Sequence, residues 1–429
     1  AEQAFQSWRK TTAAERAEKM RSWHKLIIEN KEDLARLLTI EQGKPLAESR
    51  IEIGGTANFI EWYAEEARRV YGDIIPSPVN NRQTFVTKQP VGVCAAVTPW
   101  NFHSSMIGRK VAPAIAAGCS MIIKPSEHTP FSALALAVLA EQAGFPKGLI
   151  SVVTGDSKEI VKVITDSKTV RKLSFTGSTT VGKLLISQCA DTVKRMSMEL
   201  GGNAPIIVFE DADMDAAVEG VINTKFRNAG QTCICANRIF VQNSIRETFM
   251  ARLKENVAKM KVGSGLEEGT VIGPMIHKQA AEEMTNIIKQ ATDQGAKILL
   301  GGNPHEKGIC YFEPTILDHV TTDMDVARNE IFGPIAPVIG FDSEQEVIEK
   351  ANDTDYGLAS YLYTSDLGRA WRVSDELDYG MVGINEVAIS NEGAPFGGVK
   401  QSGFGREGSK YGIDEYLDIK YRCMAGLER

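Results

Sequence analysis

In the first part of the chain, hydrophobic residues recur every three or four positions between charged ones. This spacing predicts a helix over residues 13–41, which ends near Gly43, and a second helix over about 48–69. The pattern changes over residues 73–90, where prolines and an Asn-Asn pair precede the alternating Thr84-Phe85-Val86-Thr87. Such a segment is typical of a β-hairpin, and we expect it to leave the main body.

Beyond Val91, short apolar runs alternate with longer amphipathic stretches. The apolar runs predict strands and the amphipathic stretches predict helices. Repeated strand–helix units form parallel, doubly wound sheets with helices on both faces. The expected strands are 93–97, 120–123, 149–153 and 170–175, and the expected helices are 104–117, 130–143, 157–165 and 179–190. A second series of the same kind runs from Ala204 to about residue 400, and a strand-like tail follows over 416–423.

The length and composition of the chain agree with this α/β pattern. At 429 residues it exceeds what one hydrophobic core usually serves, so two or more domains are expected. The hydrophobic content of 43% is that of a soluble globular protein, and every long apolar run is interrupted, so no membrane partner is expected. A net charge of −7 argues against nonspecific binding to nucleic acid, which requires a basic face.

The seven cysteines are odd in number and unevenly spaced, unlike those of a secreted disulfide framework. No Cys/His cluster has zinc-ligand spacing, so no metal site is predicted. We expect a reducing compartment and predict a cytoplasmic protein, although a mitochondrial matrix would leave the same pattern.

One cysteine stands in a segment that suggests chemistry. Cys233 follows Gly230-Gln231-Thr232, and Glu199 opens the upstream run Glu199-Leu200-Gly201-Gly202. A thiolate can add to a carbonyl, and a buried carboxylate can then activate the water that releases the acyl group. None of the six histidines is an obvious partner for the thiol, so a Cys-Glu pair is the sharper hypothesis. The alternative is an inert buried cysteine, the commoner fate of this residue type.

Two turns that follow predicted strands suggest a nucleotide site. Leu173–Ser178 ends a strand and opens a helix, whose N-terminus would offer backbone N–H groups to a phosphate. Lys124 and Glu127 come just after a buried strand, where an acid commonly binds ribose hydroxyls in doubly wound folds. Taken alone, each has a plain alternative: an ordinary strand-to-helix turn and a solvated loop pair.

A third turn, Pro99-Trp100-Asn101-Phe102, follows another predicted strand. The Asn101 amide can donate a hydrogen bond to a developing oxyanion, or it can cap the following helix. Phe102, Met106 and Arg109 recur at i, i+4 and i+7, so they share one face of that helix.

An arginine on an otherwise apolar face needs an anionic partner, because an unpaired buried charge is costly. Arg227, six residues before Cys233, is expected to approach the same pocket as Arg109 from the second domain. Two guanidinium groups suit a carboxylate, so we predict a substrate with an acidic end. The alternative is that each arginine pairs with a structural Asp or Glu.

These segments, in this order, resemble the NAD(P)-dependent aldehyde dehydrogenase family over essentially the whole chain. The resemblance extends to Glu330–Pro334 and Pro395–Gly398. Within the family the chain is most similar to succinate-semialdehyde dehydrogenases, notably in Lys225–Cys233 and Gly405–Gly412. The resemblance implies oxidation of succinate semialdehyde, with glutarate semialdehyde or other aliphatic aldehydes as the alternative.

The resemblance also implies a role for each segment. Cys233 would attack the aldehyde, Asn101 and the Cys233 N–H would hold the oxyanion, and Glu199 would activate water to hydrolyse a thioester. Ser390 would be a third contact for the substrate carboxylate. The cofactor would be NAD, with NADP possible. The residues expected around it are Thr98, Pro99, Trp100, Lys124, Ser126, Glu127, Phe175, Thr176, Gly177, Ser178, Glu199, Leu200, Glu330 and Phe332.

The domain organisation implied by the resemblance is two doubly wound, Rossmann-like α/β domains and a small β oligomerisation element. The β element would pair with a neighbouring subunit, in a homodimer or a homotetramer. Relatives carry a longer amino-terminal region, so part of the outer layer of the first domain is expected to precede Ala1. The expected ranges are 1–72 and 91–203 with 402–414 for the cofactor domain, 204–401 for the catalytic domain, and 73–90 with 415–429 for the β element.

Two other functions would use some of the same residues. A thioester-forming acyltransferase or hydrolase would use Cys233 without hydride transfer, but it has no use for a dinucleotide site. A non-catalytic scaffold would not need Cys233, Glu199 and Asn101 together. Cys235 is expected either to form a reducible disulfide with oxidised Cys233 or to be a small residue packed behind it.

Overall fold

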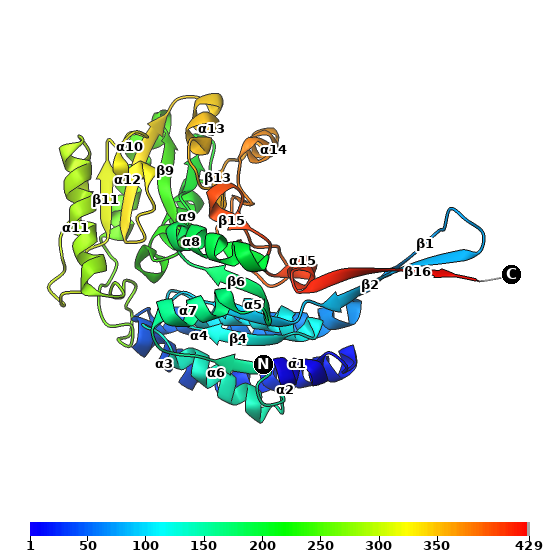
Figure 1. Ribbon diagram of the computed structural model, residues 1–429. Helices are drawn as coiled ribbons and strands as arrows, with labels where there is room; N and C mark the ends of the chain where they lie inside the picture. The colour runs from blue at the N-terminus through cyan, green and yellow to red at the C-terminus, as the bar shows by residue number, and fades with distance from the viewer. Residues whose placement is uncertain (427–429) are drawn as a thin grey trace.

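The computed structural model describes residues 1–426 and contains three β-sheets. Two of the sheets are mainly parallel and are flanked by helices, and the third is a ribbon that projects from the body (Figure 1). The expected α/β fold with two doubly wound sheets is therefore confirmed.

The first sheet has six strands, which come from the middle of the chain and from one segment near its end. They are β3 (Val93–Val97), β4 (Ser120–Lys124), β5 (Ile150–Val152), β6 (Val170–Thr176), β7 (Arg195–Glu199) and β15 (Gly403–Phe404). Their order is β15-β7-β6-β3-β4-β5, and every neighbouring pair is parallel except β15 with β7. The central strand β3 is buried along its whole length, as expected for a parallel strand covered on both faces.

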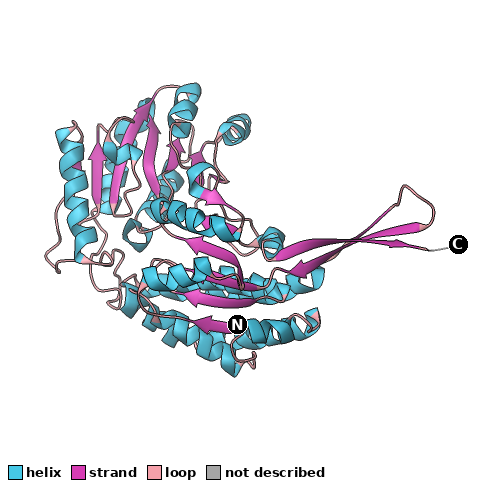
Figure 2. Cartoon of the chain, viewed as in Figure 1, coloured by secondary structure: helices cyan, strands magenta, loops and turns pink. Residues whose placement is uncertain are grey.

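Helices cover both faces of the six-stranded sheet (Figure 2). Side chains of β3 alternate between the two cores: Cys94 and Ala96 pack in one, and Val93 and Ala95 in the other. The helices of this half are α1 (Glu2–Trp8), α2 (Ala13–Glu29), α3 (Lys31–Gln42), α4 (Leu46–Glu66), α5 (His103–Ala117), α6 (Phe131–Gln142), α7 (Ser157–Asp166), α8 (Thr179–Cys189) and α15 (Ser409–Asp414).

The single helix expected over 13–41 is wrong, because two helices, α2 and α3, meet at Asn30. The Asn30 side chain donates a 2.8 Å hydrogen bond to the Leu26 carbonyl, and its backbone leaves the helical region. Asparagine favours such local side-chain bonds over continued helix. Helix α1 was not expected from the spacing; its Trp8 donates to the Ile115 carbonyl, so a distant contact holds it.

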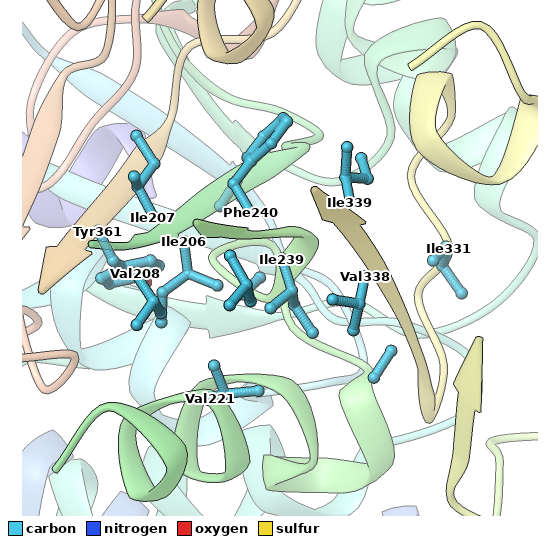
Figure 3. Close-up of a cluster of buried hydrophobic side chains, with 14 of the residues drawn as sticks. Ile206, Ile207, Val208, Val221, Ile239, Phe240, Ile331, Val338, Ile339 and Tyr361 are labelled. Carbon is cyan, nitrogen blue, oxygen red and sulfur yellow. The ribbon is translucent and has the colours of Figure 1, made fainter. Parts of the chain in front are cut away.

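The second sheet has seven strands in the order β10-β11-β12-β9-β8-β13-β14, of which only β10 runs antiparallel to its neighbour. The strands are β8 (Ala204–Val208), β9 (Ala236–Gln242), β10 (Lys297–Leu300), β11 (Thr315–Asp318), β12 (Ile335–Phe341), β13 (Ala359–Tyr363) and β14 (Met381–Ile384). The helices are α9 (Met214–Lys225), α10 (Arg246–Val257), α11 (Lys278–Asp293), α12 (Asp325–Arg328), α13 (Glu344–Asn352) and α14 (Leu367–Glu376). Figure 3 shows the pleat of its core, with Ile207, Phe240 and Ile339 on one face and Ile206, Ile239 and Val338 on the other, toward Val221 of α9.

The projecting ribbon consists of β1 (Asp73–Ile75), β2 (Arg82–Pro90) and β16 (Leu417–Ala425). The expected hairpin is confirmed, and the tail pairs antiparallel with β2 from Leu417–Pro90 to Ala425–Arg82. We propose that the three sheets mark the two domains and the β element expected from the sequence. Residues 427–429 of the expected tail lie outside the described residues.

Candidate functional site

Cys233 lies in a tight loop between α9 and β9. Three successive residues before it, Asn228, Ala229 and Gly230, adopt positive φ angles of 51°, 54° and 74°. At Gly230 a Cβ atom would fall 2.1 Å from the Gly333 carbonyl oxygen, so only glycine fits. Gln231 fastens the loop, since its side-chain oxygen accepts a 2.9 Å hydrogen bond from the Ile276 N–H. The thiol is therefore held on a preorganised turn.

Two cavities meet at Cys233, and Met106 lines both of them. The first, of about 200 Å³, contains both predicted substrate arginines, and we call it the arginine cavity. The second, of about 320 Å³, opens at the start of α8, and we call it the Ser178 cavity. Residues lining the first include Phe59, Phe102, Ser105, Arg109, Arg227, Ser390 and Phe396, and those lining the second include Pro99, Trp100, Asn101, Thr176, Gly177, Ser178, Leu200, Gly201, Glu330 and Phe332.

Arg109, on α5, is 5% exposed. Its guanidinium lies 4.6 Å from the ring centroids of both Phe59 and Phe396. One terminal nitrogen donates to the Ser390 hydroxyl, but Nη1 has no hydrogen-bond partner within residues 1–426. Because a buried guanidinium strongly favours an anionic partner, this unused donor indicates a place for an acidic ligand group.

Arg227, which follows α9, lines the arginine cavity together with Arg109, as the sequence predicted. Its guanidinium stacks over the Phe102 ring at 5.1 Å. Unlike Arg109, the residue is exposed. The two arginines thus flank one cavity, but only Arg109 is removed from water.

The Ser178 cavity has features that fit a dinucleotide. Ser178 caps α8, and its hydroxyl accepts from the Val181 N–H at 3.4 Å. The buried hydroxyls of Thr98 and Thr176 have no partner in the described chain. A Cβ atom on Gly201 would lie 2.9 Å from a Glu330 carboxylate oxygen, so the glycine keeps this wall open. A helix N-terminus with unpaired donors suits a phosphate-bearing ligand.

Aromatic and acidic groups close the end of the Ser178 cavity near Cys233. Trp100 and Phe332 pack edge to face with ring centroids 5.4 Å apart. Glu330 accepts a 3.1 Å hydrogen bond from the Gly202 N–H. Its removal from water raises the pKa of Glu330 to about 7.

Six residues predicted at the cofactor lie apart from the lining of this cavity: Thr98, Lys124, Ser126, Glu127, Phe175 and Glu199. Lys124, the last residue of β4, forms an ion pair with Glu127 at 3.1 Å, and the Ser157 hydroxyl donates to Glu127 at 2.7 Å. Ser126 accepts a 3.3 Å bond from the His128 N–H, and Phe175 sits behind Gly177, whose Cβ would fall 2.5 Å from its ring. Lys124 and Glu127 thus form a second polar patch at the same sheet edge.

Glu199, the last residue of β7, is 2% exposed and neither carboxylate oxygen has a partner among the described residues. Burial, and then the charge of Glu407, raise the pKa of Glu199 well above its usual range. Glu407 itself forms a buried ion pair with Lys110. A buried carboxylate with a raised pKa is suited to accept a proton from water.

Asn101 is buried beside the cysteine loop, and its side-chain nitrogen donates a 3.1 Å hydrogen bond to the Gln231 carbonyl. The second hydrogen of this amide remains for another acceptor. The thiol of Cys233 is protonated at neutral pH: burial and the charges of Glu330 and Glu199 raise the pKa of Cys233 to about 12. A base must therefore assist its ionisation.

Cys235 is buried, and its sulfur lies 3.3 Å from the Lys225 amine. Burial raises the pKa of the Cys235 thiol, while Lys225 opposes this shift. The reversible pairing of Cys235 with oxidised Cys233 stays a prediction.

Sequence reasoning missed several residues of the site. Phe59 and Phe396, which sandwich Arg109, come from α4 and from a loop near the end of the chain. Lys44 and Glu407 are likewise distant from Cys233 in sequence. Phe396 and Glu407 lie in segments that carry the family resemblance, but no role was predicted for either. The helical spacing around Phe59 predicts burial rather than contact with a substrate.

Residues 1–426 contain neither a cluster of metal-ligand side chains nor a membrane-spanning helix. No group of three or more His, Cys, Asp or Glu side chains is arranged to hold a metal ion. No helix in this range has the length and apolar character needed to cross a membrane.

Known proteins resemble the chain over nearly its full length. A 3-sulfolactaldehyde dehydrogenase of Pseudomonas putida is 58% identical over 100% of this chain and 88% of its own. A glutarate-semialdehyde dehydrogenase of Pseudomonas aeruginosa is 56% identical over 100% of this chain and 88% of its own. A succinate-semialdehyde dehydrogenase of Escherichia coli, whose name specifies NADP(+), is 53% identical over 99% of this chain and 88% of its own.

Solved structures of aldehyde dehydrogenases also match the chain over nearly its full length. A succinate-semialdehyde dehydrogenase from Burkholderia pseudomallei matches with a TM-score of 0.98 at 57% identity, over 99% of this chain and 88% of its own. A betaine aldehyde dehydrogenase from Staphylococcus aureus, solved with NAD+, matches with a TM-score of 0.97 at 38% identity, over 100% of this chain and 89% of its own. Residues 1–421 match the model of the Aldehyde dehydrogenase family. The chain therefore belongs to this family and is an aldehyde dehydrogenase that uses NAD(P).

Proposed function

We propose that this enzyme oxidises aldehydes with an acidic group at the far end, with succinate semialdehyde as the leading substrate. The observation that carries the proposal is the buried guanidinium of Arg109, whose Nη1 is unpaired within the described residues in the cavity that holds Cys233. A carboxylate of the substrate would supply the missing partner. Glutarate semialdehyde or another aliphatic aldehyde is the alternative.

The names of the relatives support an acidic substrate. They specify glutarate semialdehyde, succinate semialdehyde and 3-sulfolactaldehyde, and each of these aldehydes carries a carboxylate or a sulfonate. Ser390 and Arg227 would complete the contacts to this group, with Phe102 and Met106 beside the carbon chain.

Cys233, Asn101 and Glu199 divide the chemistry. The Cys233 thiol loses its proton to a water molecule, its sulfur forms the bond to the aldehyde carbon, and the free hydrogen of the Asn101 amide, with the Cys233 N–H, stabilises the oxyanion that replaces the carbonyl π bond. NAD(P), when bound, accepts the hydride that leaves this carbon. The acyl group is then a thioester on Cys233, and Glu199 removes a proton from the water that hydrolyses it.

Residues along the Ser178 cavity and the adjoining patch would hold the cofactor. Lys124 and Glu127 would bind the adenosine ribose, and Ser178, with the N-terminus of α8, would bind the pyrophosphate. Glu330 would accept from the nicotinamide ribose, and Phe332 would lie against the ring.

A panel of aldehydes tests the proposed substrate. The panel compares succinate semialdehyde and glutarate semialdehyde with butyraldehyde and valeraldehyde, which have the same chain lengths but no acid. We expect kcat/KM to be at least ~30-fold higher for the acids, since a desolvated ion pair contributes about 2–5 kcal/mol. Equal kcat/KM values for the acids and the plain aldehydes would show that the arginine cavity does not bind the acidic group of the substrate.

We also propose that the projecting ribbon is an oligomerisation element that joins copies of this chain in a homodimer or a homotetramer. Large apolar side chains stand on it in water: Ile74 and Ile419 are 75% and 74% exposed, and Tyr421 is 63% exposed. A narrow ribbon of this kind is marginal in water on its own, and a second copy of the chain would cover these side chains.

A further inference from the structure

A lysine with no assigned role lies buried beneath the Asn101 turn. Lys44 is in the connection between α3 and α4, and its side chain is 0% exposed. Its amine is 2.6 Å from a carboxylate oxygen of Glu52, 2.5 Å from the Asn101 carbonyl oxygen and 3.8 Å from the Phe102 ring centroid. All three contacts of this amine are therefore with the turn or with the acid that supports it.

Glu52 ties the same amine to the start of α5. Its second carboxylate oxygen accepts from the Ser104 and Ser105 N–H groups at 3.0 and 3.2 Å. The residue before this helix, Phe102, provides no side-chain cap, so Glu52 of α4 satisfies these donors instead. Lys44 and Glu52 together thus clamp the turn and the helix that carries Arg109.

The other half of the molecule completes the hold on Asn101. Asn228, on the cysteine loop, donates to the Asn101 carbonyl at 3.3 Å and to the Gln231 carbonyl at 3.2 Å. The Asn101 amide donates to that same Gln231 carbonyl. The backbone and side chain of Asn101 are both fixed, which leaves one amide hydrogen in a defined direction.

We propose that Lys44 is a positioning residue for aldehyde oxidation: its amine, anchored by Glu52, holds the Asn101 carbonyl so that the Asn101 amide points at the substrate oxyanion. A buried ion pair is a poor source of stability, because desolvation of both charges offsets their attraction. Placing such a pair directly against an oxyanion donor is consistent with a positioning role. Because the oxyanion forms only during the reaction, a misplaced donor lowers kcat more than it changes KM.

The test removes both charges together, so that no unpaired carboxylate is left in the core. The variant Lys44→Met/Glu52→Gln is compared with Asn101→Ala and with the combination of all three substitutions. We expect the pair to lower kcat roughly 10- to 100-fold with KM changed less than about threefold, a smaller loss than the ~100- to 1,000-fold typical of a deleted oxyanion donor. In the Asn101→Ala background the same pair should cost less than about twofold, because residues that act through one group are not additive.

Alkylation of Cys233 by iodoacetamide separates positioning from general damage, since this reaction forms no oxyanion. Its rate should stay within about twofold of the parent in Lys44→Met/Glu52→Gln. Lys172→Met/Glu415→Gln, which removes a buried lysine of β6 and its acidic partner, is the matched control and should leave kcat unchanged. If the first pair does not fold, Lys44→Gln/Glu52→Gln is measured in its place; because the introduced amide can still donate to the Asn101 carbonyl, we expect a smaller loss in kcat, which should again be suppressed in the Asn101→Ala background.

Three results would overturn the inference: an unchanged kcat, an equal loss in the parent and Asn101→Ala backgrounds, or a parallel fall in the alkylation rate. The inference rests on the proposed oxyanion role of Asn101, and the variants separate the two. If Asn101→Ala alone leaves kcat unchanged, the oxyanion assignment fails. If Asn101→Ala slows the enzyme but the Lys44 variants do not, only the role of Lys44 fails.

Discussion

Replacing Arg109 with methionine should abolish the preference for acidic aldehydes while sparing plain ones. Arg109 is 5% exposed, and within residues 1–426 its Nη1 has no partner. Losing one partner of a buried charged hydrogen bond costs about 2–5 kcal/mol, which is roughly a 30-fold to several-thousand-fold loss in kcat/KM. Methionine is unbranched and apolar and can pack between Phe59 and Phe396, so butyraldehyde oxidation should change less than about threefold.

Arg227 provides the comparison, because it lines the same cavity but is exposed. Exposed ion pairs contribute only about 0–1 kcal/mol, so Arg227→Met should lose no more than about fivefold on succinate semialdehyde. Arg9, an exposed arginine stacked at 5.0 Å on Phe5 away from the site, is the matched control, and Arg9→Met should affect neither substrate. The assay is steady-state formation of reduced cofactor with both aldehydes. Equal losses on both aldehydes in Arg109→Met, or a larger loss in Arg227→Met, would refute this reasoning.

Four further predictions concern the cofactor, the thiols and the ribbon. Hydrogen bonding from Ser157, with the nearby Lys124, holds the pKa of Glu127 at about 2, so the carboxylate stays ionised above that pH and should repel a 2′-phosphate. NAD should therefore give a higher kcat/KM than NADP, and Glu127→Ser should reduce the difference between the two cofactors. A higher kcat/KM with NADP would contradict this role of Glu127. The pKa of Cys233 is raised to about 12, so the fraction of thiolate should still increase with pH at pH 10. The rate at which iodoacetamide alkylates Cys233 without cofactor should increase with it, and an alkylation rate that stops increasing below pH 9 would contradict this pKa. Mild peroxide should inactivate the enzyme and dithiothreitol should restore it, but Cys235→Ala should lose the recovery; full recovery of that variant would make Cys235 a packing residue only. Sedimentation should show a dimer or tetramer that dissociates when Ile419 and Tyr421 are replaced by lysine, and a parent monomer at all concentrations would exclude the ribbon contact.

Much of the fold follows from local periodicity. The strand expected at 93–97 is β3 without change, and the helix expected over 179–190 is α8, which ends one residue earlier. Buried parallel strands are short and uniformly apolar, so their limits are visible in the sequence. The break at Asn30 was missed because it depends on one side chain bonding to its own helix rather than on the apolar pattern.

The site was predictable only where a residue carries its own chemistry. Cys233 and Glu199 were proposed from their neighbours in sequence, and Arg109 from its helical spacing. The roles of Phe59, Phe396 and Lys44 were not predicted, because they arise from contacts between segments far apart in the chain; Phe396 was noted only within the Pro395–Gly398 segment. The same holds for the pKa of Glu199, which is set by burial and by Glu407.

The most direct test of the proposed chemistry is to trap the acyl group on Cys233. Glu199→Gln keeps the shape of the buried side chain but cannot accept a proton from water. Mixed with NAD and succinate semialdehyde, this variant should release about one equivalent of reduced cofactor per active site and then stall, as expected when hydrolysis alone is blocked. Mass spectrometry of the digested protein should find a succinyl group on the peptide that contains Cys233. Steady turnover without a burst, or a succinyl group on another residue, would contradict the assignment of Cys233 as nucleophile and Glu199 as hydrolytic base.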